Sequence, residues 1–196
     1  MMNLAHYFTL FRIILIPFFP IIFIGYSVLG IPEMLVPIIL LIILGICEFT
    51  DAIDGVIARK KNQVTDLGKV LDPLADSVMR LSVFLTFTQK PIEIPLLLVL
   101  VFVYRDALIN AMRILFALKG SAMAARKSGK IKAILQAVVS FAILILMVFY
   151  SYGKITLSTF RVVSIVLMSI AAVYTVASAV EYFYANMASL KRSFKS

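Results

Sequence analysis

The chain has 196 residues, of which 62% are hydrophobic and only 15% are charged. Its mean hydropathy of +1.04 excludes an ordinary water-soluble domain and indicates an integral membrane protein. The net charge of +9 does not indicate a nucleic-acid-binding protein, because most basic residues lie in short connections between apolar runs, where they set topology and attract lipid headgroups.

Apolar runs of about 20 residues recur along the chain, which is typical of transmembrane helices. The predicted fold is all-α, an integral membrane bundle of six transmembrane helices in a single domain, residues 1–196. A short interfacial segment, residues 1–8, precedes the first span. The predicted spans are 11–29, 34–58, 67–87, 94–118, 131–150 and 158–187.

The basic residues of the connections predict the orientation in the membrane. Eleven lie at the end that carries both termini, and the connections at the other end hold only Lys90 and Lys154. Because cytoplasmic connections are enriched in Lys and Arg, both termini are expected in the cytoplasm. The eleven are Arg59, Lys60, Lys61, Lys119, Arg126, Lys127, Lys130, Lys132, Lys191, Arg192 and Lys195.

Four aspartates flank the first basic connection. Asp51 and Asp54 are three residues apart, and Asp72 and Asp76 are four apart, so each pair falls on one face of a helix. An antiparallel helix hairpin would bring the two pairs to a similar depth. Acids at membrane depth are costly unless they are paired or bind a ligand, and hard divalent cations prefer carboxylate oxygens. The pattern therefore predicts a metal site that opens to the cytoplasm.

Spacing alone leaves two other interpretations open. The acids could be solvated at a helix–loop junction and neutralised by Arg59 and Lys69, although this gives no reason for two facing pairs. They could also form the cation or proton relay of a six-helix transporter.

The complete motif D-x2-D-G-x2-A-R-x8-G-x3-D-x3-D runs from Asp51 to Asp76 with every position matched. In this motif the chain resembles the CDP-alcohol phosphatidyltransferase family, and it looks most like one branch, the bacterial phosphatidylglycerophosphate synthases. The similarity to the branch covers nearly the whole chain, through Asn3, Thr9-Leu10-Phe11-Arg12, Ile16-Pro17, Arg105-Asp106, Arg113, Gly129-Lys130-Ile131-Lys132 and Glu181-Tyr182-Phe183-Tyr184. Three positions depart from the branch: Ser77 replaces a usual Lys, Asp106 a usual Glu and Ala133 a usual Thr.

The resemblance implies an enzyme that transfers a phosphatidyl or similar group from a CDP-linked donor to an alcohol and releases CMP. It also implies a homodimer. The expected location is the cell membrane, and the charges of the connections predict that the active site faces the cytoplasm. Two divalent ions, Mg²⁺ or Mn²⁺, would bind principally to Asp51, Asp54 and Asp72. Asp76 would complete the metal site and act as general base on the acceptor hydroxyl. The donor would lie against Gly55, Ala58 and Gly68, which make room for cytidine, and Arg59, which lies near the diphosphate.

A second group of cations points to the acceptor. Arg105 and Arg113 are eight residues apart and share a helix face, and Lys130 and Lys132 begin the fifth span. Because the metals already neutralise the donor diphosphate, these cations favour a second phosphate on the acceptor. Glycerol 3-phosphate is the expected acceptor, with inositol phosphate as the alternative, and CDP-diacylglycerol is the expected donor because its acyl chains can stay in the bilayer. Two plainer interpretations remain: the lysines are ordinary cytoplasmic charges, and Arg105 pairs with Asp106 or snorkels.

The sequence does not assign a role to three further charged residues. For Arg12, in the first turns of the first span, the simplest expectation is a side chain that snorkels to the interface. Arg80 could contact the donor phosphate or pair with an acid, and Glu48 lies one turn before Asp51, where it could support the metal ligands.

Overall fold

The computed structural model describes residues 4–60, 66–118 and 127–193, and within these ranges all regular secondary structure is helical. The side chains of residues 4–6, 8, 54–60, 66–72, 117–118, 127 and 188–193 lie outside the description. The elements are α1 (Leu4–Leu15), α2 (Phe18–Gly25), a 3-10 turn η1 (Glu33–Leu35), α3 (Val36–Lys60), α4 (Asp66–Thr86), α5 (Leu96–Leu118), α6 (Lys127–Ser151) and α7 (Leu157–Ser193).

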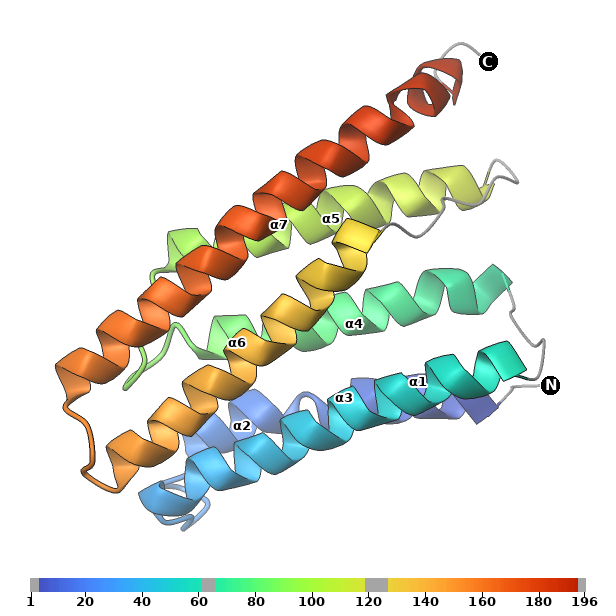
Figure 1. Cartoon of the computed structure of the whole chain (residues 1–196). Helices are drawn as coiled ribbons and strands as arrows, with labels where there is room; N and C mark the ends of the chain where they lie inside the picture. The colour runs from blue at the N-terminus through green and yellow to red at the C-terminus, as the bar shows by residue number, and fades with distance from the viewer. Residues whose placement is uncertain (1–3, 61–65, 119–126, 194–196) are drawn as a thin grey trace.

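The long helices run side by side along one bundle axis (Figure 1). α6 packs along α7 and α3, α4 packs against α5, and α1 lies against both α3 and α4. The start of α1 and the end of α7 lie at the same end of the bundle (Figure 1). This arrangement agrees with the prediction that both termini are on one side of the membrane.

Within the described residues, three helical segments are long and apolar enough to cross a membrane: Glu33–Ile53, Ser128–Ser151 and Leu157–Met187. This agrees with the predicted helical membrane protein, whereas the count of six spans stays a prediction. α5 falls outside this group because it carries Arg105, Asp106 and Arg113 within its apolar sequence. Because of these three charged residues, composition alone does not identify α5 as a membrane span.

The predicted first span, residues 11–29, is two helices rather than one. α1 ends at Leu15 and α2 begins at Phe18, and Pro17 at the junction has no backbone N–H to continue the helical ladder. Residues 4–8 form the first turns of α1 and are not a separate segment. The break at Pro17 leaves α1 as a short helix beside α3 and α4, where Arg12 reaches both of them.

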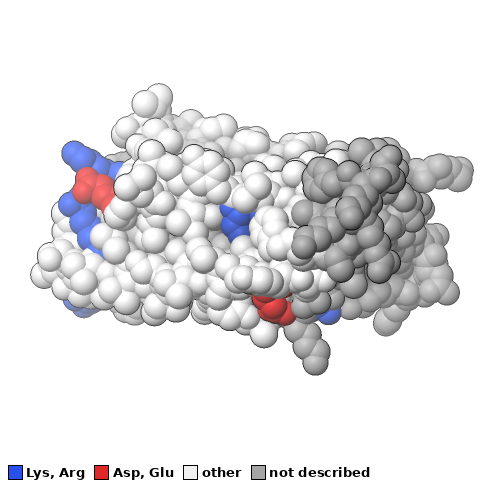
Figure 2. Space-filling model, turned by 90° about the horizontal axis from the view of Figure 1, so that it is seen from above, with Lys and Arg blue, Asp and Glu red and all other residues white. Residues whose placement is uncertain are grey.

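The apolar core is rich in phenylalanine, and the outer surface is also apolar. The rings of Phe84 and Phe102 join α4 to α5 with their centroids 4.7 Å apart. Figure 2 shows a face on which nearly all the described side chains are uncharged. A lipid environment permits an apolar exterior over an apolar core. Lipid tails are as apolar as the core, so apolar side chains are equally stable on either side of the helices.

Candidate active site

A cavity of about 270 Å³, lined by several charged side chains, lies between α4, α5, α6 and α7. From α4 it is lined at positions 73, 76, 77 and 80, which the helical period places on one face. From α5 it is lined at positions 105, 106, 109, 110 and 113, again along one face. Among the described side chains, its charged lining consists of five cations and two carboxylates, so it is suited to an anionic ligand: Arg80, Arg105, Arg113, Lys130, Lys132, Asp76 and Asp106.

Arg12 connects two of the four motif aspartates. Its Nη1 donates to Oδ1 of Asp51 on α3 and to Oδ1 of Asp76 on α4, the latter at 2.9 Å. The Arg12 side chain is only 2% exposed, so the prediction that it snorkels to the interface is wrong. A buried guanidinium needs an acidic partner, and two carboxylates from different helices provide it here. The three residues hold α1, α3 and α4 together at the site.

Asp106 organises the cations on the α5 and α6 side of the cavity. It is almost fully buried, and its Oδ1 accepts hydrogen bonds from Lys132 Nζ at 2.6 Å and Arg105 Nη1 at 2.8 Å. The expected alternative that Arg105 pairs with Asp106 is therefore correct, yet Arg105 still lines the cavity. A buried carboxylate shared by two cations fixes both side chains while leaving them a net positive charge.

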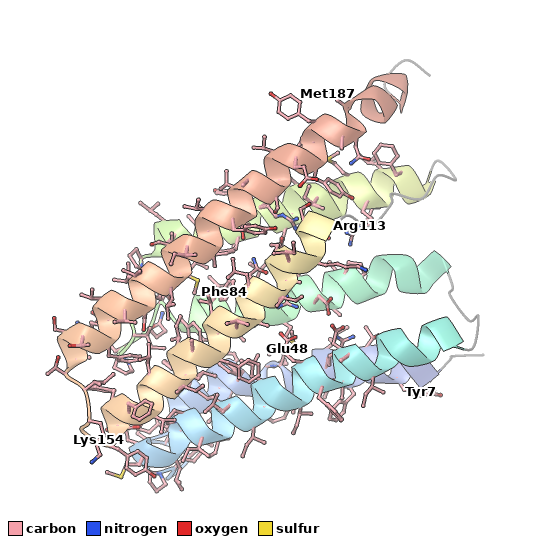
Figure 3. The ribbon with its side chains drawn as sticks, viewed as in Figure 1. Tyr7, Glu48, Phe84, Arg113, Lys154 and Met187 are labelled. Carbon is pink, nitrogen blue, oxygen red and sulfur yellow. The ribbon has the colours of Figure 1, made fainter. Side chains whose placement is uncertain are left out.

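Arg80 is a second buried arginine on the cavity wall. Its Nη1 donates to Oε1 of Glu48 at 3.2 Å and to the backbone carbonyl of Ala133 at 2.8 Å. Two roles were left open for Arg80, a contact with the donor phosphate and a pair with an acid. The structure shows the pair with an acid, Glu48. These contacts join α3, α4 and α6 at the wall of the cavity, and Figure 3 shows Glu48 on α3 facing into the bundle.

The structure brings some of the predicted site residues together and leaves others undescribed. Asp51 and Asp76 meet at Arg12, while Arg105, Arg113, Lys130 and Lys132 line the same cavity as Asp76. Figure 3 shows Arg113 projecting from α5. The predicted residues whose backbone lies in α3 or α4 but whose side chains fall outside the description are Asp54, Gly55, Ala58, Arg59, Gly68 and Asp72.

Arg12 and Arg80 were not among the predicted site residues, and Asp106 was predicted only as a partner for Arg105. One signal was available for the arginines. A charged residue inside an apolar run is costly at membrane depth and is expected to pair with an opposite charge. The identity of that partner, however, depends on contacts between helices that are far apart in sequence.

The carboxylates are compatible with a divalent cation. Asp51 and Asp76 already share one positively charged group, so they lie close enough to share a metal ion. An all-carboxylate oxygen set suits Mg²⁺ or Mn²⁺. Among the described side chains alone, no three Asp, Glu, His or Cys residues come together. Of the four predicted metal ligands, the structure describes the side chains of two, Asp51 and Asp76.

Several known proteins resemble this chain over nearly its whole length. The sequence model for CDP-alcohol phosphatidyltransferase matches residues 2–177. A Bacillus subtilis protein named CDP-diacylglycerol–glycerol-3-phosphate 3-phosphatidyltransferase is 34% identical, over 98% of this chain and 100% of its own length. Proteins with the same name from Haemophilus influenzae and Rickettsia typhi are 31% and 33% identical, over 96% and 94% of this chain and 95% and 97% of their own lengths.

Proposed function

Because this chain belongs to the CDP-alcohol phosphatidyltransferase family, we propose that it transfers a phosphatidyl group from CDP-diacylglycerol to glycerol 3-phosphate. The products are phosphatidylglycerophosphate and CMP. The observation that carries the proposal is that Asp76 shares one cavity with a group of five cations. A base and an anion-binding surface in one cavity suit an acceptor that has both a hydroxyl and a phosphate.

The acceptor phosphate binds to the cations of α5 and α6. Arg113 forms no ion pair among the described residues, so its guanidinium is available to phosphate oxygens in a bidentate arrangement. Arg105 and Lys132 are held by Asp106 and contribute positive charge from the cavity wall. Since the cavity has a net positive charge, it disfavours neutral or cationic acceptors such as serine and choline.

Asp76 takes the proton of the acceptor hydroxyl. The hydroxyl oxygen forms a new bond to the phosphorus of the phosphatidyl group, and the bond from that phosphorus to the CMP oxygen breaks. Asp76 lines the cavity and also contacts Arg12, so it faces both the acceptor side and the motif side of α4. A carboxylate between two such regions can collect the proton where the new bond forms.

The donor diphosphate lies on the motif side, toward Asp51, Asp54 and Asp72. The family generally depends on divalent metal, and bound Mg²⁺ or Mn²⁺ would neutralise charge on the diphosphate. Gly55, Ala58, Arg59 and Gly68 form the cytidine and diphosphate contacts in this proposal. We further propose that the site faces the cytoplasm in the cell membrane, that CDP-diacylglycerol keeps its acyl chains in the bilayer, and that two copies pair as a homodimer.

CMP release by the purified protein tests the proposal. The donor is CDP-diacylglycerol with magnesium, and the acceptors are glycerol 3-phosphate, inositol 1-phosphate, inositol, serine and choline. Turnover with glycerol 3-phosphate, abolished by EDTA, is the expected result. Turnover only with an unphosphorylated alcohol would contradict the role of the cations. No turnover with any acceptor would favour the alternative of a cation or proton transporter.

A further inference from the structure

Ser77 and Asn110 form a neutral hydrogen-bonded pair within the otherwise charged cavity. Asn110 Nδ2 on α5 donates to Ser77 Oγ on α4 at 3.0 Å. The Ser77 hydroxyl in turn donates to the backbone carbonyl of Pro73 at 2.9 Å. Both side chains are half-buried and line the cavity. The serine hydroxyl proton is thus committed, and the serine oxygen accepts from the amide.

The Asn110 amide keeps unused hydrogen-bonding capacity. A primary amide has two N–H donors and a carbonyl acceptor, and only one donor is engaged by another described residue, Ser77. The second N–H and the Oδ1 atom therefore remain for a molecule in the cavity. This combination of one donor and one acceptor matches an alcohol hydroxyl, which can accept and donate at the same time.

The pair lies between the two functional parts of the cavity. Ser77 directly follows Asp76 on α4, and Asn110 lies between Arg105 and Arg113 on one face of α5. The Ser77–Asn110 hydrogen bond therefore joins the position of the proposed base to the face that bears the phosphate-binding arginines. A ligand that contacts both Asp76 and the arginines would share the cavity with this pair.

We propose that the Ser77–Asn110 pair binds the hydroxyl of the acceptor that does not react, and so selects for a vicinal diol phosphate. The inference rests on the proposed function, in which one hydroxyl meets Asp76 and the phosphate meets the cations. In glycerol 3-phosphate the C1 hydroxyl reacts, and the C2 hydroxyl lies between it and the phosphate. Asn110 is placed to hydrogen-bond this central group, and Ser77 holds the amide in position. A site built this way discriminates against an analogue that lacks the hydroxyl, because the amide is then left unpaired.

The experiment compares glycerol 3-phosphate with 3-hydroxypropyl phosphate, which has the same length but no C2 hydroxyl. The wild-type protein should use glycerol 3-phosphate with a kcat/KM at least about tenfold higher. Asn110→Leu, which removes the amide and keeps the branched shape of the side chain, should reduce this ratio to below about threefold. The loss should fall on glycerol 3-phosphate alone, with the Michaelis constant for CDP-diacylglycerol unchanged.

Asn186→Leu is the matched control, because the Asn186 amide donates to the Tyr182 carbonyl on α7 and is not part of the cavity lining. This variant should keep the wild-type ratio. Asn110→Ser and Ser77→Ala provide the same comparison if Asn110→Leu is unstable, and both should lower the ratio. An unchanged ratio in all three site variants, or equal use of both acceptors by the wild type, would overturn the inference while leaving the proposed function intact. No CMP release by the wild type with either acceptor would instead overturn both.

Discussion

Nη1 of Arg12 lies 2.9 Å from Oδ1 of Asp76, and the same nitrogen donates to Asp51, so one buried guanidinium joins the motif carboxylates of α3 and α4. Along the chain, Arg12 is 39 residues from Asp51 and 64 residues from Asp76. Arg12 therefore provides a positive charge between two acids that would otherwise repel each other.

Arg12→Gln should destabilise the metal-free protein. Removing one partner of a buried ion pair typically costs about 3 kcal/mol or more, because the other charges remain buried without it. The thermal unfolding midpoint in detergent with EDTA should fall by several degrees. Magnesium should then raise the midpoint more in the variant than in the wild type, because a bound cation would replace the missing charge.

Arg161→Gln is the control for this measurement. Arg161 pairs with Glu93 at 2.8 Å, but both side chains are about one-third exposed. Such a pair contributes little to stability, about 1 kcal/mol at most. Equal magnesium-induced shifts in wild type, Arg12→Gln and Arg161→Gln would show that Arg12 and the metal do not serve the same carboxylates.

Asp76→Asn should abolish CMP release while the protein still folds and inserts into the membrane. Asparagine keeps an oxygen that can accept from Arg12 but cannot take a proton at neutral pH. General-base catalysis is typically worth at least about a hundredfold in rate, and a loss of metal affinity would add to this. CMP release and gel filtration of the same preparation measure the two effects. Substantial remaining CMP release would refute the role of Asp76 as base.

Asp106→Asn should weaken acceptor binding. Without the full charge of Asp106, Lys132 and Arg105 lose the group that fixes both of them. The Michaelis constant for glycerol 3-phosphate should rise about tenfold, with little change in that for CDP-diacylglycerol. Asp106→Glu keeps the charge and should stay within about threefold of wild type. Equal increases for both substrates in Asp106→Asn would indicate a general disturbance of the fold instead.

Arg113→Ala should also raise the Michaelis constant for glycerol 3-phosphate much more than that for CDP-diacylglycerol. Arg113→Lys retains the charge but not the planar fork that binds two phosphate oxygens, so it should fall between Ala and wild type. Steady-state kinetics with each substrate varied in turn will measure this order. If Lys is no better than Ala, or if both substrates are affected equally, Arg113 does not bind the acceptor phosphate.

The sequence by itself determined the helical class, the family and the residues that could carry the chemistry. Apolar runs have a composition and length that are visible without any tertiary contact, and the motif from Asp51 to Asp76 is local in sequence. The helical period also placed Arg105 and Arg113 on one face of a single helix, and both line the cavity. These features depend on spacing along one or two neighbouring helices.

Only the tertiary structure decided which helices meet and what each buried charge contacts. Arg12 was expected at the membrane interface because a long basic side chain near a helix end can reach it, yet the packing of α1 against α3 and α4 places it on two carboxylates. The Ser77–Asn110 hydrogen bond likewise depends on the register between α4 and α5. Periodicity assigns a residue to a face of its own helix, but the partner of that face is set by three-dimensional packing.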